Sequence, residues 1–167
     1  MLRIIKETII LFVLIILIAF IANSVSPKRI PYIGTWYDNR DKIALDKPPS
    51  YDPDYDSLLT MEDAFYLWKS GDAVFIDARD KSEYNSGHIS GAINLPFEHW
   101  DNYWDYVSSL ITPQTKIVTY CGGYNCELSV DAARELKVLG YPNTYIFFNG
   151  YDKWLELNLP RETSSEE

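Results

Sequence analysis

The chain is poor in cysteine and in basic residues, and each shortage excludes a class of protein. Two cysteines in 167 residues are too few for a scaffold that is held together by disulfides. They leave three arrangements open: a redox pair, a single nucleophile with a bystander, or two buried thiols. Lys and Arg number 15 against 24 Asp and Glu, which gives a formal net charge of −9. Because no basic surface could neutralise phosphates, we expect no nucleic-acid partner.

Histidine is also scarce, with two residues in the chain. A zinc site would have to combine His88 and His99 with Cys121 and Cys126. Their spacing is unlike that of a closed four-ligand site. We therefore predict no metal and no cofactor.

The chain is not short of apolar residues, and its longest apolar run lies close to the N-terminus. Counted from Ile4 to Val25, this run is long enough to cross a hydrocarbon core of roughly 30 Å as a helix. Residues 22–24 also offer small side chains of the kind that a signal peptidase reads. We predict that residues 1–25 are a transmembrane anchor or a signal peptide. An N-terminal anchor ahead of an acidic domain most often exports that domain, so we expect the extracytoplasmic side, or a periplasmic or secreted protein if the leader is cleaved.

The rest of the chain divides by composition into three parts. Residues 26–57 are rich in Pro, Asp and Tyr without a sustained period, which predicts an extended linker. Residues 58–160 show the periodicities of a globular domain, and residues 161–167 form an acidic tail that we expect to be solvated.

Short apolar strands alternate with amphipathic helices in the globular part. The expected strands are 73–77, a brief one after the loop 86–96, 117–120 and 144–148, and the expected helices are 61–70, 100–107, 129–139 and 152–157. This alternation implies an α/β fold with a mostly parallel central sheet and helices on both faces. Ligands bind beyond the carboxyl ends of such strands, where Asp77 and Cys121 both fall.

Cys121 stands at the point where a β-branched strand ends and a loop begins. Gly122 and Gly123 follow it, and a helical pattern opens at Ser129. Loop amides and a helix N-terminus favour negative charge, and a thiolate is the nucleophilic form of cysteine. We expect the two glycines to let the backbone turn tightly beneath an exposed sulfur.

Three ordered motifs resemble those of the rhodanese-like family. The segment from Asp77-Ala-Arg79 to Gly87-His-Ile-Ser-Gly-Ala-Ile-Asn-Leu-Pro96 is similar to the family's N-terminal signature, and residues 140–154 are similar to its C-terminal one. Cys121 takes the place of the catalytic cysteine. The resemblance covers about residues 58–160 and implies the three-layer rhodanese-like fold, here preceded by an N-terminal hydrophobic helix. It also implies a sulfurtransferase, in which the cysteine takes sulfane sulfur from a small donor or a protein persulfide and passes it from its own persulfide to a thiol acceptor.

The resemblance places a site around Cys121. The substrate-binding loop would be Gly122, Gly123, Tyr124, Asn125, Cys126 and Glu127, with Asp77, Arg79, His88 and Ser129 in support. We expect Asp77 and Arg79 to form an ion pair that fixes the strand end, and His88 to make a structural hydrogen bond.

The loop departs from the family pattern in two ways. The fifth residue after the cysteine is commonly arginine in the family but is Cys126 here, and the helix serine comes eight rather than six residues later. No Arg or Lys lies between Cys121 and Ala133. A lost charge-assisted hydrogen bond is worth about 1.5–3 kcal/mol, so we expect weak thiosulfate activity or a different donor, such as a polysulfide.

Several alternatives remain open from the sequence. Cys126 either resolves the Cys121 persulfide as a disulfide or packs inward as an ordinary loop residue. A phosphatase of a related fold would carry histidine before the cysteine and arginine at the end of the loop, and both are missing here. A non-catalytic binding module tethered to the membrane is the other rival.

Overall fold

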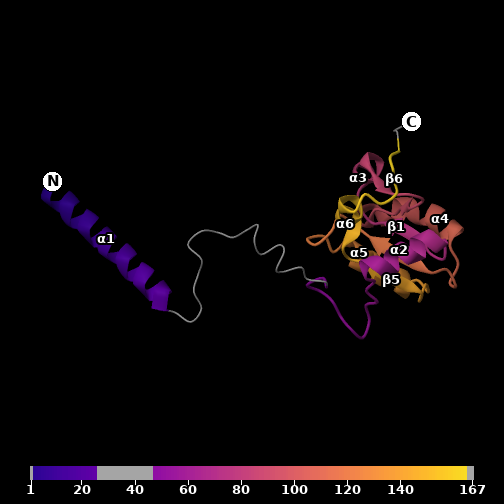
Figure 1. Cartoon of the computed structure of the whole chain (residues 1–167), viewed down its shortest axis with the longest axis horizontal. Helices are drawn as coiled ribbons and strands as arrows, with labels where there is room; N and C mark the ends of the chain where they lie inside the picture. Colours follow the sequence, from indigo (N-terminus) through magenta and orange to yellow (C-terminus); the bar gives the residue numbers. More distant parts are fainter. Residues whose placement is uncertain (1, 26–46, 165–167) are drawn as a thin grey trace. The chain divides into compact units, whose positions relative to one another are not determined.

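The computed structural model describes residues 2–25 and 47–164, and the chain divides into two compact units, Met1–Ile43 and Ala44–Glu167 (Figure 1). Residues 26–46, the larger part of the predicted linker, lie outside the described residues. Each unit is described by itself.

The first unit contains one long helix, α1 (Leu2–Val25). Its segment Ile5–Asn23 has a mean hydropathy of 2.7 and no buried surface. At a rise of about 1.5 Å per residue, the helix is long enough to cross a membrane, a property that it shares with signal sequences. The predicted hydrophobic helix is therefore present.

The second unit is built on a parallel sheet of four strands in the order β3-β1-β4-β5. Its strands are β1 (Val74–Asp77), β3 (Ile93–Asn94), β4 (Ile117–Tyr120) and β5 (Thr144–Phe147). Its helices are α2 (Met61–Ser70), α3 (Lys81–Ser86), α4 (Trp100–Leu110), α5 (Leu128–Val138) and α6 (Gly150–Glu156), with a short 3₁₀ turn, η1, at Phe97–His99. Strands and helices alternate as predicted.

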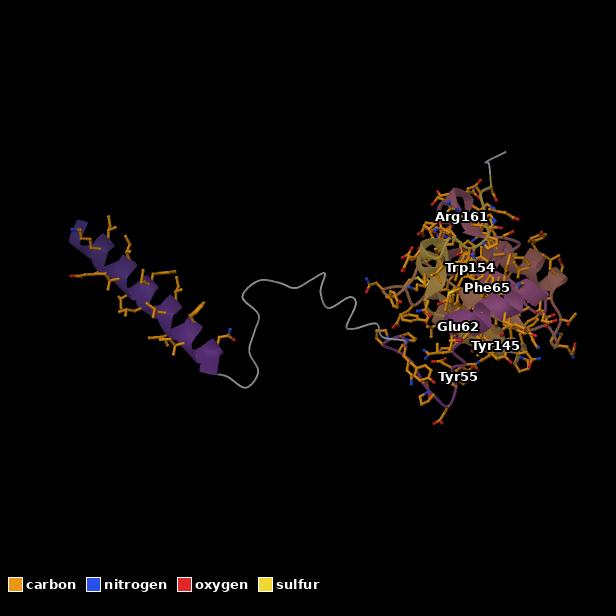
Figure 2. All side chains as sticks on the ribbon, viewed as in Figure 1. Tyr55, Glu62, Phe65, Tyr145, Trp154 and Arg161 are labelled. Carbon is orange, nitrogen blue, oxygen red and sulfur yellow. A yellow bond between two sulfur atoms is a disulfide. The ribbon has the colours of Figure 1, made fainter. Side chains whose placement is uncertain are left out.

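Helices cover both faces of this sheet, because alternate strand residues point to opposite sides. On one face, Phe75, Val118 and Phe147 pack with residues of α2 and α6 in a single apolar cluster. Phe65 of α2 and Trp154 of α6 meet there, with ring centroids 6.0 Å apart (Figure 2). On the other face, Ile76 and Ile117 pack against α4 and α5, and aromatic residues of α4 lie partly buried against this cluster. The three-layer α/β architecture is confirmed.

Local sequence explains where α2 begins and ends. The Thr60 hydroxyl accepts a hydrogen bond from the Asp63 backbone N–H and donates one to the Asp63 carboxylate, so Thr60 caps the start of the helix. Gly71 ends the helix with a φ of 71°, a conformation that glycine adopts without a steric penalty.

The described start of the predicted tail and the described end of the predicted linker both make contacts with the folded domain. Arg161 and Glu162 form β6, which pairs antiparallel with β2 (His88–Ile89). Asp56 is buried and forms an ion pair with Arg134 of α5, so the described residues before Leu58 are anchored to the domain. Described residues on the outer side of both predicted limits, 57 and 161, are therefore held by partners far away in the sequence.

Two helix predictions also need correction. The helix predicted over residues 129–139 spans Leu128–Val138, and Leu139, which follows it, is 42% exposed. The last helix begins at Gly150 rather than Asp152.

Candidate functional site

Three neighbouring strands end in one row at the same edge of the sheet. Asp77 of β1 is in register with Tyr120 of β4, and Tyr120 is in register with Phe147 of β5. The segments that follow these strands therefore meet at this edge. Cys121 is the first residue after β4, so it lies where ligands bind in parallel sheets.

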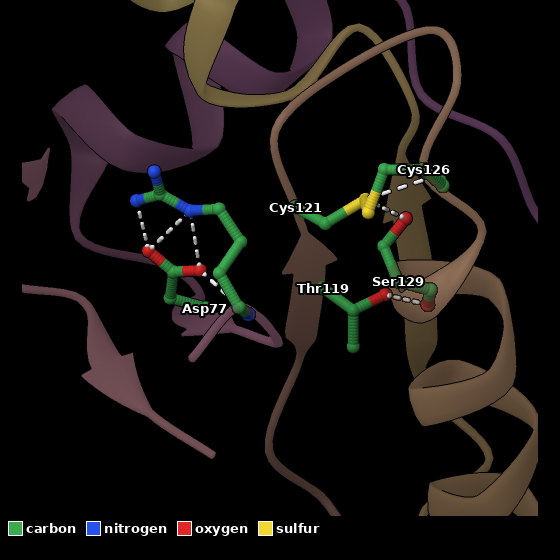
Figure 3. The surroundings of a disulfide bond; sticks show 6 residues. Asp77, Thr119, Cys121, Cys126 and Ser129 are labelled. Atoms are coloured by element: carbon green, nitrogen blue, oxygen red, sulfur yellow. Dashed lines mark hydrogen bonds and ion pairs between the residues drawn. A yellow bond between two sulfur atoms is a disulfide. The ribbon is translucent and has the colours of Figure 1, made fainter. Parts of the chain in front are cut away.

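Cys121 and Cys126 are joined by a disulfide, with their Cα atoms 6.3 Å apart (Figure 3). Cys121 has no exposed surface in this state. The expectation of an exposed sulfur was thus wrong for the disulfide form, because the loop folds Cys126 back onto it. The backbone N–H of Cys126 donates to the Gly123 carbonyl at 2.8 Å, and this bond closes the turn.

Other backbone N–H groups of this loop remain unpaired. Within the described parts of the chain, no hydrogen bond is made by the N–H groups of Gly122, Gly123, Tyr124, Asn125 or Glu127. The loop leads directly into α5, whose N-terminus adds the positive end of a helix dipole. Unpaired donors and a helix N-terminus next to a sulfur suit an anionic sulfur species.

Ser129 supplies a side-chain contact to this sulfur. Its hydroxyl oxygen lies 3.5 Å from Cys121 Sγ and is buried. Thr119 fixes this geometry, because its hydroxyl donates to the Ser129 backbone carbonyl at 2.7 Å (Figure 3). In the reduced protein, the Ser129 hydroxyl can donate to a Cys121 thiolate and favour that charged form.

The turn into α6 holds the other side of the loop. The N–H groups of Tyr151 and Asp152 donate to the carbonyls of Cys121 and Gly122, each at 2.8 Å. Gly150 has a φ of 65°, and a Cβ there would lie 2.5 Å from the Cys121 carbonyl oxygen. Gly150 is thus required by the site, although sequence reasoning noted it only as part of the C-terminal motif.

The loop glycines act differently from what was expected. A Cβ on Gly122 would meet no atom within 4 Å, so no close approach requires glycine there. A Cβ on Gly123 would approach the Asn149 carbonyl at 3.3 Å. The Asp152 carboxylate is nearer still, at 3.1 Å, so the tight approach at Gly123 is made to the first turn of α6 and to the residue before it, and not beneath the sulfur.

Asp77 and Arg79 form the predicted ion pair, and it is buried at the end of β1. Burial lowers the pKa of Arg79, but hydrogen bonds and the charge of Asp77 outweigh it and raise the pKa above its usual value. Arg79 also donates to the Gly87 carbonyl and lies over the Tyr151 ring. The guanidinium is thus engaged by protein groups and fixes the strand end.

His88 has a structural role, as expected. Its ring is buried, stacks on Tyr84 and makes a 2.8 Å hydrogen bond between Nδ1 and the Tyr84 carbonyl. Tyr120, which precedes the cysteine, accepts a hydrogen bond from the Ile89 N–H, and burial raises its pKa well above 10.0. It therefore remains a neutral phenol near neutral pH.

The nearest arginine along the chain after the loop is also occupied. Arg134 donates to both carboxylate oxygens of Asp56 and to the Ser50 carbonyl. The Glu127 carboxylate accepts from the Ser50 N–H. No arginine closes the loop, so nothing here supports the phosphoryl chemistry of the related phosphatases.

The remaining loop residues form its outer rim. Tyr124 and Asn125 are exposed, and the Tyr124 hydroxyl accepts from the Asn149 amide at 3.2 Å. Across the described residues, no three His, Cys, Asp or Glu side chains are grouped as metal ligands.

Two curated proteins of different kinds are similar in sequence to parts of this chain. An HTH-type transcriptional regulator from Mycobacterium tuberculosis is 38% identical over 66 residues, which are 40% of this chain and 27% of that protein. A tRNA uridine(34) hydroxylase from Buchnera aphidicola is 28% identical over 122 residues, 70% of this chain and 38% of that protein. The chain thus spans less than two fifths of the length of these relatives.

The fold and the family agree with the geometry. A crystal structure of a protein from Anabaena matches with a TM-score of 0.53 and 27% identity, over 62% of this chain and 92% of that one. The family model of the rhodanese-like domain matches residues 63–157, which are more than half of the chain and include all four strands of the parallel sheet. The chain belongs to the rhodanese-like domain family.

Proposed function

We propose that this chain is a sulfurtransferase that carries sulfane sulfur as a persulfide on Cys121. The observation that carries the proposal is the position of this cysteine, at the end of β4 and beneath a loop with unpaired N–H groups. The names of the relatives do not point to one shared activity, so the argument rests on the site itself.

The chemistry requires a thiolate and a means to hold a second anion. In the reduced protein, the Cys121 thiolate attacks the outer sulfur of the donor, and the rest of the donor leaves as sulfite or as a thiolate. The product is a persulfide anion on Cys121. The Ser129 hydroxyl and the loop N–H groups are suited to stabilise both anions. An acceptor thiolate then attacks the outer sulfur and restores the Cys121 thiolate.

The charges around the site favour a donor with little negative charge. Arg79 is committed to Asp77, and Arg134 is committed to Asp56. A doubly charged donor such as thiosulfate would be held by dipoles alone, and a missing charged hydrogen bond costs about 1.5–3 kcal/mol, roughly one to two decades in binding. We therefore propose a polysulfide or a persulfide as the donor, with weak thiosulfate turnover.

We also propose that α1 anchors the domain to a membrane, with the domain on the extracytoplasmic side. The support is the 19-residue apolar segment Ile5–Asn23 together with the acidic composition of the rest. Protease protection of the C-terminus in sealed cells and in spheroplasts tests the side, and cleavage of α1 would show instead that it is a signal sequence.

The decisive experiment is persulfide formation on the reduced full-length chain in detergent. The chain is incubated with thiosulfate, a polysulfide or glutathione persulfide, with Cys121→Ser as the control, and the intact mass is read in a Cys126→Ser background. We expect the mass to increase by one sulfur atom with the polysulfide and persulfide donors, and only where Cys121 is present. Failure with every donor would favour the non-catalytic binding module.

A further inference from the structure

Cys126 is placed to react with whatever sulfur Cys121 carries. The two residues are five positions apart and form a disulfide within the same loop. The turn that brings Cys126 back is closed by its N–H bond to the Gly123 carbonyl. The two sulfur atoms are therefore brought together by the fold of this one loop.

The outer part of the loop is held in this conformation by contacts to the next strand end. The Tyr124 ring packs edge-on against Phe148, and its hydroxyl accepts from the Asn149 side chain. On the inner side, Tyr151 and Asp152 hold the Cys121 and Gly122 carbonyls. A thiol fixed at this position competes with external thiols at a large advantage, because its encounter with Cys121 is intramolecular.

We infer that Cys126 resolves the Cys121 persulfide and that the chain releases the transferred sulfur as sulfide. The inference rests on the proposed persulfide. The Cys126 thiolate attacks Cys121 Sγ, which is the inner sulfur of the persulfide. A bond forms between the two cysteine sulfurs, the bond to the outer sulfur breaks, and that sulfur leaves with the electron pair as hydrosulfide.

The electrons of this step balance within the chain. Two cysteine thiols are oxidised to one disulfide, and one sulfane sulfur is reduced to sulfide. The proton of the Cys126 thiol passes to solvent or to the hydrosulfide. The product is the disulfide seen in the structure, in which Cys121 has no exposed surface. A dithiol reductant must then restore both thiols before the next turnover, so this route releases sulfide and competes with transfer of the outer sulfur to an acceptor thiol.

A single-turnover experiment tests the inference. The reduced full-length chain in detergent is freed of reductant without oxygen and mixed with one equivalent of glutathione persulfide, with no thiol added beyond the one equivalent of glutathione that the transfer releases. Sulfide and intact mass are measured for the wild type, Cys126→Ser and Cys121→Ser. Cys126→Ala serves as a second variant, and circular dichroism checks that each variant is folded.

The expected result separates the three proteins. The wild type releases about one sulfide per chain and loses the mass of two hydrogens. Cys126→Ser gains the mass of one sulfur atom and releases no sulfide. Cys121→Ser releases no sulfide and keeps its mass. If the wild type keeps the added sulfur as Cys126→Ser does, the inference is overturned while the proposed function stands. If Cys126→Ser and Cys126→Ala are folded and gain no sulfur, or gain a glutathione adduct, the proposed function itself fails.

Discussion

The ends of β1 and β4 lie next to each other in the sheet, yet their polar groups are in opposite states. At the end of β1, the Asp77 carboxylate receives hydrogen bonds from the Arg79 backbone and guanidinium. At the end of β4, a loop leaves several N–H groups without acceptors around Cys121. Both segments occupy the edge where parallel sheets bind ligands. The difference shows that a position at the carboxyl end of a strand does not by itself make a binding site, because a polar group that is already hydrogen-bonded within the protein cannot bind a substrate.

From this comparison, we expect variants at the two strand ends to differ in what they change. Changes at the closed β1 end should alter stability and leave the chemistry of Cys121 intact in molecules that stay folded. Changes at the open β4 end should alter the chemistry more than the stability.

The largest effect is expected for Asp77→Asn. It leaves the buried Arg79 guanidinium without its counter-charge, and removal of one partner of a buried ion pair costs about 3–5 kcal/mol. Thermal or urea unfolding of the full chain in detergent measures the loss. Asp72→Asn, at an exposed position, serves as a control that should change little.

The expected difference between the two strand ends would be contradicted if folded Asp77→Asn no longer formed a persulfide on Cys121. That outcome would mean that the β1 end takes part in the chemistry instead of supporting the strand.

Gly150→Ala should affect the Cys121 loop through the turn into α6, which contacts that loop. The new Cβ would collide with the Cys121 carbonyl, and alanine at a φ of 65° costs about 1–3 kcal/mol. Because the loop must shift, we expect persulfide formation to slow roughly tenfold to a hundredfold. The rate is measured by mass with glutathione persulfide.

Gly71→Ala provides the matched control. Gly71 also has a positive φ, of 71°, but a Cβ there meets no atom within 4 Å. It should destabilise the chain by a comparable amount without slowing the reaction. Equal slowing in both variants would show that Gly150 matters only for stability.

Sequence reasoning found the features that depend on local pattern. The helix predicted over residues 100–107 is present, with Val107 buried and its aromatic residues packed against the core. The pairing of Asp77 with Arg79 was expected from the short motif that contains both residues. The place of Cys121 followed from a strand ending next to a helical pattern. Such features are encoded within a few residues, so periodicity reveals them.

Features made by distant residues were missed. Asp56 and Arg134 are 78 positions apart, and the segment around Asp56 has no period that would place it on the domain. The pairing of Arg161 with Ile89 is equally long-range. Thr119 is a buried polar residue in a strand, and only the position of α5 explains it. Tertiary contacts of this kind leave no local signature.

Ser129→Ala should produce a smaller and purely chemical effect. It removes the hydroxyl that lies 3.5 Å from Cys121 Sγ, and a hydrogen bond to a charged group is worth about 1.5 kcal/mol at this long distance, or about one pKa unit. We expect the pKa of the Cys121 thiol to rise. Alkylation by iodoacetamide across pH, in the reduced Cys126→Ser background, reports this pKa. An unchanged profile would assign Ser129 to packing alone.

The smallest effect is expected for Asp56→Asn, which breaks the ion pair between Asp56 and Arg134. Burial raises the pKa of Asp56, but hydrogen bonds and the charge of Arg134 outweigh it and lower the pKa below 3.8. The folded state therefore gains stability from the ionised carboxylate above pH 3.8, and this gain is lost as the pH falls through the lowered pKa.

At neutral pH we expect Asp56→Asn to be less stable than the wild type by about 1 kcal/mol, because Arg134 is partly exposed. Thermal unfolding of both proteins at neutral pH and near about pH 2 measures the difference, which should vanish at the acidic pH. Persulfide formation should be unchanged, because Arg134 does not serve the loop in either protein. A difference in stability that persisted in acid would show that Asp56 holds its segment to the domain by packing rather than by charge. Faster thiosulfate turnover in the variant would show that Asp56 keeps the Arg134 cation away from the loop after β4.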